Sequence, residues 1–352
     1  MTMARKQLVD FEITRYYHCL TRCVRRAYLC GDDPVTGKSY AHRKDWIENR
    51  LRELAGIFSL DVCGFSVMDN HLHVLLRLNP ALAVGWSAED VVRRWSKLFP
   101  PRDKTGKVLP VGETWIAARR DDAAWVAKTR QRLGDLGWFM KCLKEPLAKL
   151  ANREDDCTGV FFEGRFKSIA ILDEASLLAT CAYIDLNPVA AGKCAVPEKS
   201  EHTSVKSRVE HVKSKGRLEA VTSDSPYVGS RDHEHDHWLC PIENRSRRGA
   251  KRIGMLEGLS LTGYLKLLDW SSRLLRSGKK SVSRAAAPLL ERLHIDAASW
   301  EATLRRFFSG EKLVGNFFGS ASRLQEAATA KGRHWLKDLG HRVPLTSPPP
   351  VS

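Results

Sequence analysis

The segment 65–76 constrains the fold more than any other part of the chain, because it reads as an apolar β-strand interrupted by His71 and His73. Side chains alternate faces along a strand, so the two histidines point one way while Leu72 and Val74 point the other. Two imidazoles about 6–7 Å apart on one strand can bind one divalent cation. The spacing alone is more typical of two half-exposed histidines on a strand face than of a metal site, so a second motif is needed to favour the metal site.

That second motif lies in the segment 183–188, which follows a helix-forming run at 173–179. Residues four apart share one face of a helix, so Tyr183 and Asn187 are expected to lie one above the other. Pro188 is expected to stop or kink this helix. Asp185 falls off the shared face and is not expected to be a ligand. A tyrosine beside an oxygen ligand, together with two histidines on a strand, is typical of metal-assisted phosphoryl transfer.

With these motifs the chain resembles the single-tyrosine HUH transposases, the group that includes the REP-associated tyrosine transposases. The resemblance covers roughly residues 10–205, and 206–352 resemble no known family. Two positions depart from the family pattern, because Asp69 stands where many relatives carry proline and Asp185 where many carry histidine. The segments that carry the resemblance are, in chain order, His71-Leu72-His73, Trp138-Phe139-Met140-Lys141, Gly164-Arg165-Phe166-Lys167-Ser168 and Tyr183-Ile184-Asp185-Leu186-Asn187-Pro188-Val189.

The residues of the two motifs divide into a nucleophile and three metal ligands. We expect His71, His73 and Asn187 to hold Mg²⁺ or Mn²⁺ and to leave coordination positions open for phosphate and water. Tyr183 would be the nucleophile, although its hydroxyl, with an ordinary pKa of about 10, attacks poorly while protonated. The resemblance implies transesterification of single-stranded DNA through a 5′-phosphotyrosine link with a free 3′-hydroxyl, the chemistry of DNA transposition and recombination.

Composition supports a nucleic-acid partner. The net charge of +16 and the pI near 9.6 indicate a polyanionic binding partner. Such a partner is more often nucleic acid than an anionic membrane. We expect single-stranded DNA with hairpins, no membrane, and a homodimer as an open alternative. The nine scattered cysteines and the lack of an apolar leader favour reduced thiols in the cytoplasm. The residues expected to contact DNA are Arg22, Lys141, Arg165, Lys167, Arg247 and Arg248.

Hydrophobic periodicity indicates helices at 43–58 and 138–153, a strand at 160–172 with Arg165 and Lys167 on one face, and partial helices at 88–98 and 121–133. The resulting order of core elements, β-α-β-β-α-β-α between residues 11 and 190, predicts an α+β fold. We expect a ferredoxin-like antiparallel sheet with helices on one face, the fold that the resemblance also implies. Residues 1–205 would form this domain, with an insertion at 80–136, and would cleave DNA alone. A basic polar linker at 206–253, a helical C-terminal domain at 254–340 and a disordered tail at 341–352 would complete the chain.

Two other functions remain open on the sequence. The first is a domesticated DNA-binding protein, or a nickase of repeat elements, that does not transpose autonomously. The second is a metal-dependent nuclease in which water attacks the phosphate. A covalent link between the protein and DNA separates transesterification from hydrolysis.

Overall fold

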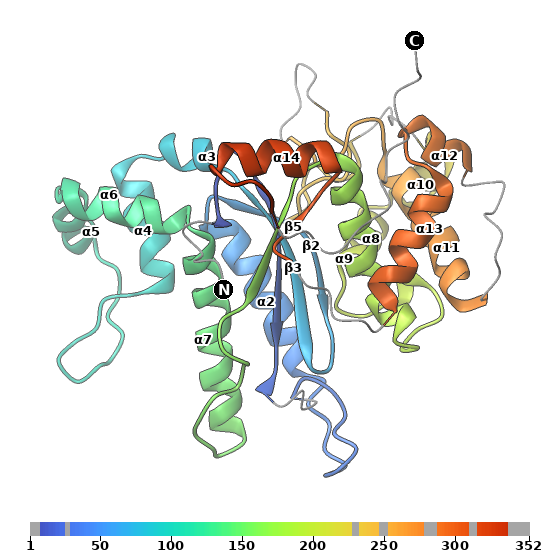
Figure 1. Ribbon diagram of the computed structural model, residues 1–352. Helices are drawn as coiled ribbons and strands as arrows, with labels where there is room; N and C mark the ends of the chain where they lie inside the picture. Colours follow the sequence, from blue (N-terminus) through green and yellow to red (C-terminus); the bar gives the residue numbers. More distant parts are fainter. Residues whose placement is uncertain are drawn as a thin grey trace.

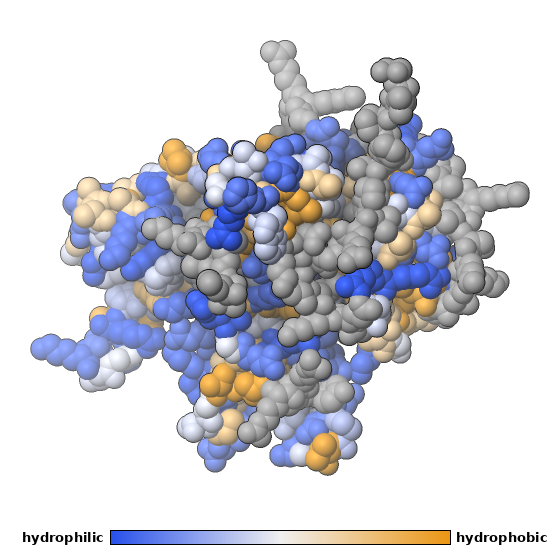
Figure 2. Space-filling model, viewed as in Figure 1, coloured by the Kyte–Doolittle hydropathy of each residue, from blue (hydrophilic) through white to orange (hydrophobic). Residues whose placement is uncertain are grey.

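The computed structural model describes residues 8–24, 29–226, 232–245, 253–277, 287–309 and 315–336. It confirms an α+β fold, in which one five-stranded sheet stands between two layers of helices (Figure 1). Hydrophilic residues cover most of the described surface in Figure 2, and apolar residues gather there in small separate patches. Within the described residues, no helix is both long enough and apolar enough to cross a bilayer.

The sheet has the strand order β2-β3-β1-β4-β5. The first four strands pair antiparallel, and β5 pairs parallel to β4. The register places His71 opposite Arg22, His73 opposite Leu20, and Leu20 opposite Lys167. Directly opposed residues of antiparallel strands share a face, so these side chains lie on one side of the sheet. The bounds are β1 Tyr16–Arg22, β2 Leu60–Val67, β3 His71–Leu78, β4 Lys167–Ile171 and β5 Phe317–Phe318.

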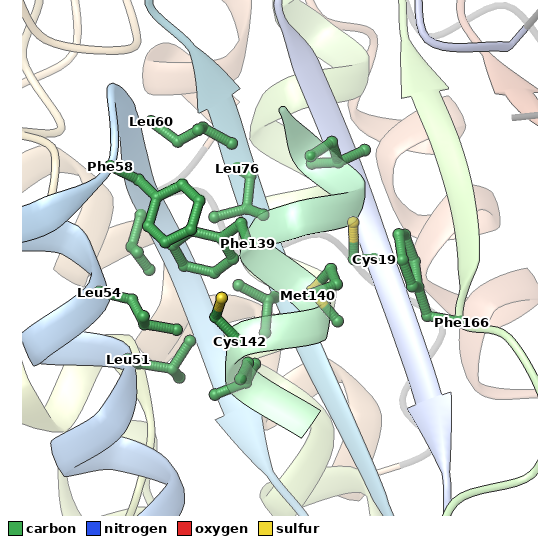
Figure 3. Packing of buried hydrophobic residues seen from close by; sticks show 14 of the residues in the cluster. Cys19, Leu51, Leu54, Phe58, Leu60, Leu76, Phe139, Met140, Cys142 and Phe166 are labelled. Carbon is green, nitrogen blue, oxygen red and sulfur yellow. The ribbon is translucent and has the colours of Figure 1, made fainter. Parts of the chain in front are cut away.

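One face of the sheet carries the helices α2 (Arg43–Ile57) and α7 (Leu136–Glu154). Both helices bury an apolar stripe that recurs every three or four residues, as the sequence predicts for 43–58 and 138–153. Figure 3 shows Phe139 and Met140 of α7 packed over Leu76 and Cys19 of the strands. This core holds the strands that present the two histidines on the other face.

The opposite face carries α8 (Glu174–Ala190), so helices cover both faces of the sheet, whereas we expected them on one face only. The helix α8 is mostly apolar, and from Ala175 to Val189 every residue except Tyr183 is buried. A helix buried on all sides needs neighbours on all sides. Those neighbours are α9 (Ser204–Ser214), α11 (Leu261–Ser277) and α13 (Ala297–Phe308), which share one hydrophobic core with α8.

The region expected as a linker, 206–253, is therefore partly structured. It contains most of α9 and all of α10 (Leu218–Ser223). Arg208 of α9 is 1% exposed and donates to the main-chain carbonyls of Cys63 and Cys240 and to the carboxylate of Glu234. Polar residues such as Glu210, Lys213 and Ser214 on the exposed side of α9 gave this interval a linker-like composition, whereas its buried side holds Val205 and Val212.

Most of the remaining helices also bury residues in one of the two cores. The insertion at 80–136 is helical at 88–98, as predicted, and over nearly all of the predicted 121–133. The bounds are α3 Pro80–Val84, α4 Ala88–Leu98, α5 Glu113–Arg120, α6 Ala123–Leu133, the 3₁₀ helix η2 Pro197–Lys199, α12 Ala287–Arg292 and α14 Ala321–Ala330.

Candidate active site between the sheet and α8

Three histidines from two adjacent strands meet on the α8 face of the sheet. The ring of His73 stacks on that of His18 at a centroid distance of 5.0 Å and meets the ring of His71 edge-on at 4.9 Å. His18 and His73 are 4% and 1% exposed, and His71 is half-buried. The alternation of β3 thus brings the two predicted ligands to one side, with His18 of β1 as a third ring that the sequence did not single out.

Burial lowers the pKa of each of these histidines and keeps the rings neutral. The pKa of His71 falls to about 4, where the charge of Arg22 lowers it further while a hydrogen bond with Asn187 opposes the shift. The pKa of His18 falls to about 3, and that of His73 lies well below its ordinary value. Neutral imidazole is the form that ligates a metal.

The hydrogen bonds of the rings leave Nε2 of His73 available. His73 shares a 2.8 Å hydrogen bond between its Nδ1 and Nε2 of His18, whereas His71 places its Nδ1 2.7 Å from Oδ1 of Asn70 and also has a hydrogen bond with Asn187. If Nδ1 of His73 carries the proton, the lone pair of its Nε2 is free. The Nε2 atom of His73 is buried and has no hydrogen-bond partner in the described part of the chain. A buried nitrogen without a partner is costly unless a ligand fills that role.

Tyr183 lies against this histidine cluster. Its ring meets His73 edge-on at 5.2 Å and His18 at 6.0 Å. Burial raises the pKa of Tyr183, and a hydrogen bond with Asn187 and the charge of Arg22 oppose that shift. The helix α8 therefore brings the predicted nucleophile to the predicted ligands across the sheet.

Asn187 lies one turn after Tyr183, as the spacing predicts. Its Nδ2 donates to the main-chain carbonyl of Tyr183 at 3.0 Å, which leaves Oδ1 as an acceptor toward the site. Its side chain reaches both His71 and Tyr183. The helix continues through Pro188 to Ala190 instead of stopping at the proline.

The residues of the site fit a divalent metal only if the amide oxygen of Asn187 is one of the ligands. The described residues contain no group of three or more His, Cys, Asp and Glu side chains placed to hold a metal ion. Two imidazoles and the amide of Asn187 would be the ligands instead, and the partnerless Nε2 of His73 is the observation that fits such an ion. A set with so few protein ligands leaves positions for phosphate and water.

Two of the predicted DNA contacts lie at this site. Arg22 is half-buried and close enough to affect the pKa values of His71, His73 and Tyr183. Lys167 lies close enough to His18 to lower its pKa. Both cations therefore contribute positive potential beside the candidate nucleophile.

Arg165 and Lys141 lie elsewhere, on the α7 side of the sheet. They line a groove of about 350 Å³ with Lys144, Phe162 and Phe166. We expected Arg165 and Lys167 on one face of a strand at 160–172, but β4 begins only at Lys167. Arg165 follows the turn at Gly164, whose φ is 43°, and lies outside the strand in the groove, whereas Lys167 is the first residue of β4 and lies near His18.

Arg247 and Arg248 fall outside the described residues. Sequence reasoning missed two contributions to the site that are described. His18 carries no motif of its own, and only its parity with Arg22 on a predicted first strand could have pointed to it. Phe307 and Phe308 of α13 lie 4.7 and 5.1 Å from the Tyr183 ring, and no local signal connects them with residue 183.

Comparisons with known proteins give little beyond this geometry. No family model matches the chain, and no curated protein matches it. A solved structure of the REP-associated tyrosine transposase bound to a REP hairpin is similar at a TM-score of 0.33 and 11% identity. The alignment covers 60% of this chain and 86% of that chain. Similarity at this level carries no argument about function, which therefore depends on the side chains described above.

Proposed function

We propose that the protein is a DNA strand transferase that cleaves and rejoins single-stranded DNA through a phosphotyrosine link at Tyr183. One observation carries the proposal: the only residue of α8 between 175 and 189 that is not buried is the tyrosine that faces the histidine cluster. The strand order β2-β3-β1-β4, with α2 and α7 as the crossover helices, supports a ferredoxin-like core for this site.

The reaction assigns a separate task to each residue. The Tyr183 oxygen would attack the phosphorus and give up its proton to solvent, the P–O3′ bond would break, and the 3′-oxygen would leave as a hydroxyl. The phosphate would keep its bond to the 5′-oxygen of the downstream fragment and would join that fragment to the tyrosine oxygen. Attack by a second 3′-hydroxyl would reverse these steps and join the strands. The link conserves the bond energy, so no nucleotide cofactor is needed.

Metal binding is part of the proposal. His71, His73 and Asn187 would hold Mg²⁺ or Mn²⁺, and the ion would polarise the scissile phosphate. Arg22 would add positive charge beside the phosphate, and His18 would hold His73 in the orientation and tautomer that a ligand needs. The net charge of +16 supports DNA as the substrate.

A covalent-adduct assay tests the proposal. Wild type and Tyr183→Phe would be incubated with labelled hairpin-bearing single-stranded DNA and run on a denaturing gel. We expect a labelled protein band in the wild type that is absent from the variant, because only the hydroxyl is removed. Tyr40→Phe is the matched control, since its ring contacts Arg43 by its face at 4.1 Å and lies outside the site. An adduct that persists in Tyr183→Phe rules out this nucleophile.

One observation favours a second function, a DNA-binding protein that has kept the fold without strand transfer. The Tyr183 ring packs against Phe307 and Phe308 as well as the histidines, and its raised pKa disfavours the phenolate. In that case DNA binding would persist, and the gel would show neither an adduct nor cleavage products.

A further inference from the structure

The last turn of α13 reaches the candidate active site from a part of the chain outside residues 10–205. Phe307 and Phe308 both contact the ring of Tyr183, and α13 lies beside α8 (Figure 1). The two phenylalanines differ in what else they do. Phe307 is 7% exposed and meets Phe318 of β5 at 5.5 Å, so it anchors α13 to the sheet.

Phe308 is only partly buried and belongs to the margin of the core. Packing therefore does not fully account for an aromatic ring at this position. Its ring lies 5.1 Å from Tyr183, at the rim of a site that also holds the positive charge of Arg22. A partly exposed aromatic ring against a nucleophile, in a site that also holds a cation, matches a nucleotide, because a base stacks on the ring while the cation attracts the phosphate.

We propose that Phe308 is a stacking platform for the nucleobase that adjoins the phosphodiester attacked by Tyr183. This inference depends on the proposed function for the identity of that phosphodiester. Stacking uses the π-face that every base has, so the platform would position single-stranded DNA without selecting its sequence. A paired base is stacked within its own duplex, so the platform also favours single strands over duplex.

The test is a double-mutant cycle that combines variants of the full-length protein with variants of the DNA. Affinity would be measured in EDTA for an intact single strand and for the same strand with an abasic analogue beside the cleavage position. We expect Phe308→Ala to weaken binding of the intact strand about 5- to 100-fold and to leave binding of the abasic strand unchanged. Phe308→Trp should bind the intact strand at least as well as the wild type.

Two further variants separate stacking from folding. Phe308→Leu keeps apolar bulk without a ring, so it should fold and still lose the preference for the intact strand. Phe99→Ala removes a phenylalanine that is 40% exposed beside Trp95 and should change neither affinity. The platform is overturned if Phe308→Ala loses the same affinity for the intact strand as for the abasic strand. It is also overturned if Phe308→Ala cleaves faster than the wild type, because Phe308 would then be a cover over Tyr183.

The outcomes also separate this inference from the proposed function. If the wild type forms no tyrosine adduct but its preference for the intact strand requires Phe308, strand transfer fails, while Phe308 is still shown to stack on a base of the bound strand. If the wild type forms the adduct and Phe308→Leu binds both strands as the wild type does, the platform fails and strand transfer stands.

Discussion

At the scale of single residues, the two ring nitrogens of His73 have different partners and so different roles. Nδ1 is paired with His18, and Nε2 is buried without a partner in the described residues. Outer partners of this kind fix ligand orientation and typically change metal affinity 10- to 100-fold. His18 is therefore a positioning residue for a ligand rather than a ligand itself.

Replacing His18 tests that role. His18→Phe keeps a ring in the stack and removes the hydrogen bond, so Mn²⁺ affinity should fall about 10- to 100-fold while DNA affinity in EDTA stays unchanged. The measurement is a Mn²⁺ titration followed by electron paramagnetic resonance. His42→Gln, which changes a half-exposed histidine paired with Glu154, is the control. Unchanged Mn²⁺ affinity in His18→Phe would contradict the assignment.

The buried histidines also predict how stability depends on pH. Burial lowers the pKa of His71 from 6.5 to about 4, so the unfolded chain binds a proton there more readily than the folded chain. The free energy of unfolding is therefore unaffected by the titration of His71 above about pH 6.5, and it decreases as the pH falls from 6.5 toward 4. In EDTA, the melting temperature should therefore decline between pH 6.5 and 5, and His71→Gln should decline less steeply. Parallel curves for the two proteins would refute this prediction.

At the scale of elements, an ion-pair triad fixes the turn between β2 and β3 relative to α8. Asp69 in this turn pairs at 2.7 Å with both Lys44 of α2 and Lys193 just beyond α8. Burial would raise the pKa of Asp69, but hydrogen bonds from the two lysines lower it overall. Asp69 thus links the strand that begins at His71 to the helix that carries Tyr183.

Asp69→Asn should destabilise the protein by about 1–3 kcal/mol, because it removes a buried carboxylate and leaves the mostly buried Lys44 without its counter-charge, while the exposed Lys193 contributes less. Cleavage should fall more than the loss of folded protein explains, since the strand and the helix lose a shared anchor. Denaturant unfolding and single-turnover cleavage at a stability-matched temperature measure both effects. Glu145→Gln, which breaks an exposed pair with Lys149, should change neither. If Asp69→Asn cleaves like the wild type, the triad does not position the site.

Sequence patterns predicted these elements well where periodicity was strong. The helices at 43–58 and 138–153 were placed within a few residues, and the alternation at 71–76 correctly put both histidines on one face. The prediction that helices cover one face only was wrong, because the mostly apolar sequence of α8 indicates a buried helix without identifying its neighbours. The register that brings His18 to His73 depends on long-range pairing, which a local pattern does not contain.

At the scale of the whole molecule, the C-terminal helices complete the core around α8. Tyr264 of α11 donates a 2.5 Å hydrogen bond to the buried Asp185, and Trp300 of α13 is fully buried in the same core. The domain boundaries stay a prediction, but this packing argues against independent cleavage by residues 1–205. The resemblance ends near residue 205, so sequence alone could not reveal the shared core.

Truncation after residue 205 tests this packing. The shortened chain would expose the apolar side of α8 and leave Asp185 without the Tyr264 donor, so we expect aggregation or a large fall in melting temperature. Differential scanning fluorimetry and size-exclusion chromatography measure the effect, with truncation after residue 336 as the control that removes only residues outside the described ones. A monomeric 1–205 fragment with wild-type cleavage would mean that the C-terminal helices are an accessory.

The central claim is that Tyr183 itself becomes joined to DNA. The most direct measurement is mass spectrometry of the trapped wild-type protein after nuclease and protease digestion. We predict a peptide containing residue 183 with a nucleotide attached to the tyrosine oxygen through its 5′-phosphate, formed only when divalent metal is present. Cleaved DNA with a free 5′-phosphate and an unmodified Tyr183 peptide would contradict the claim and indicate attack by water.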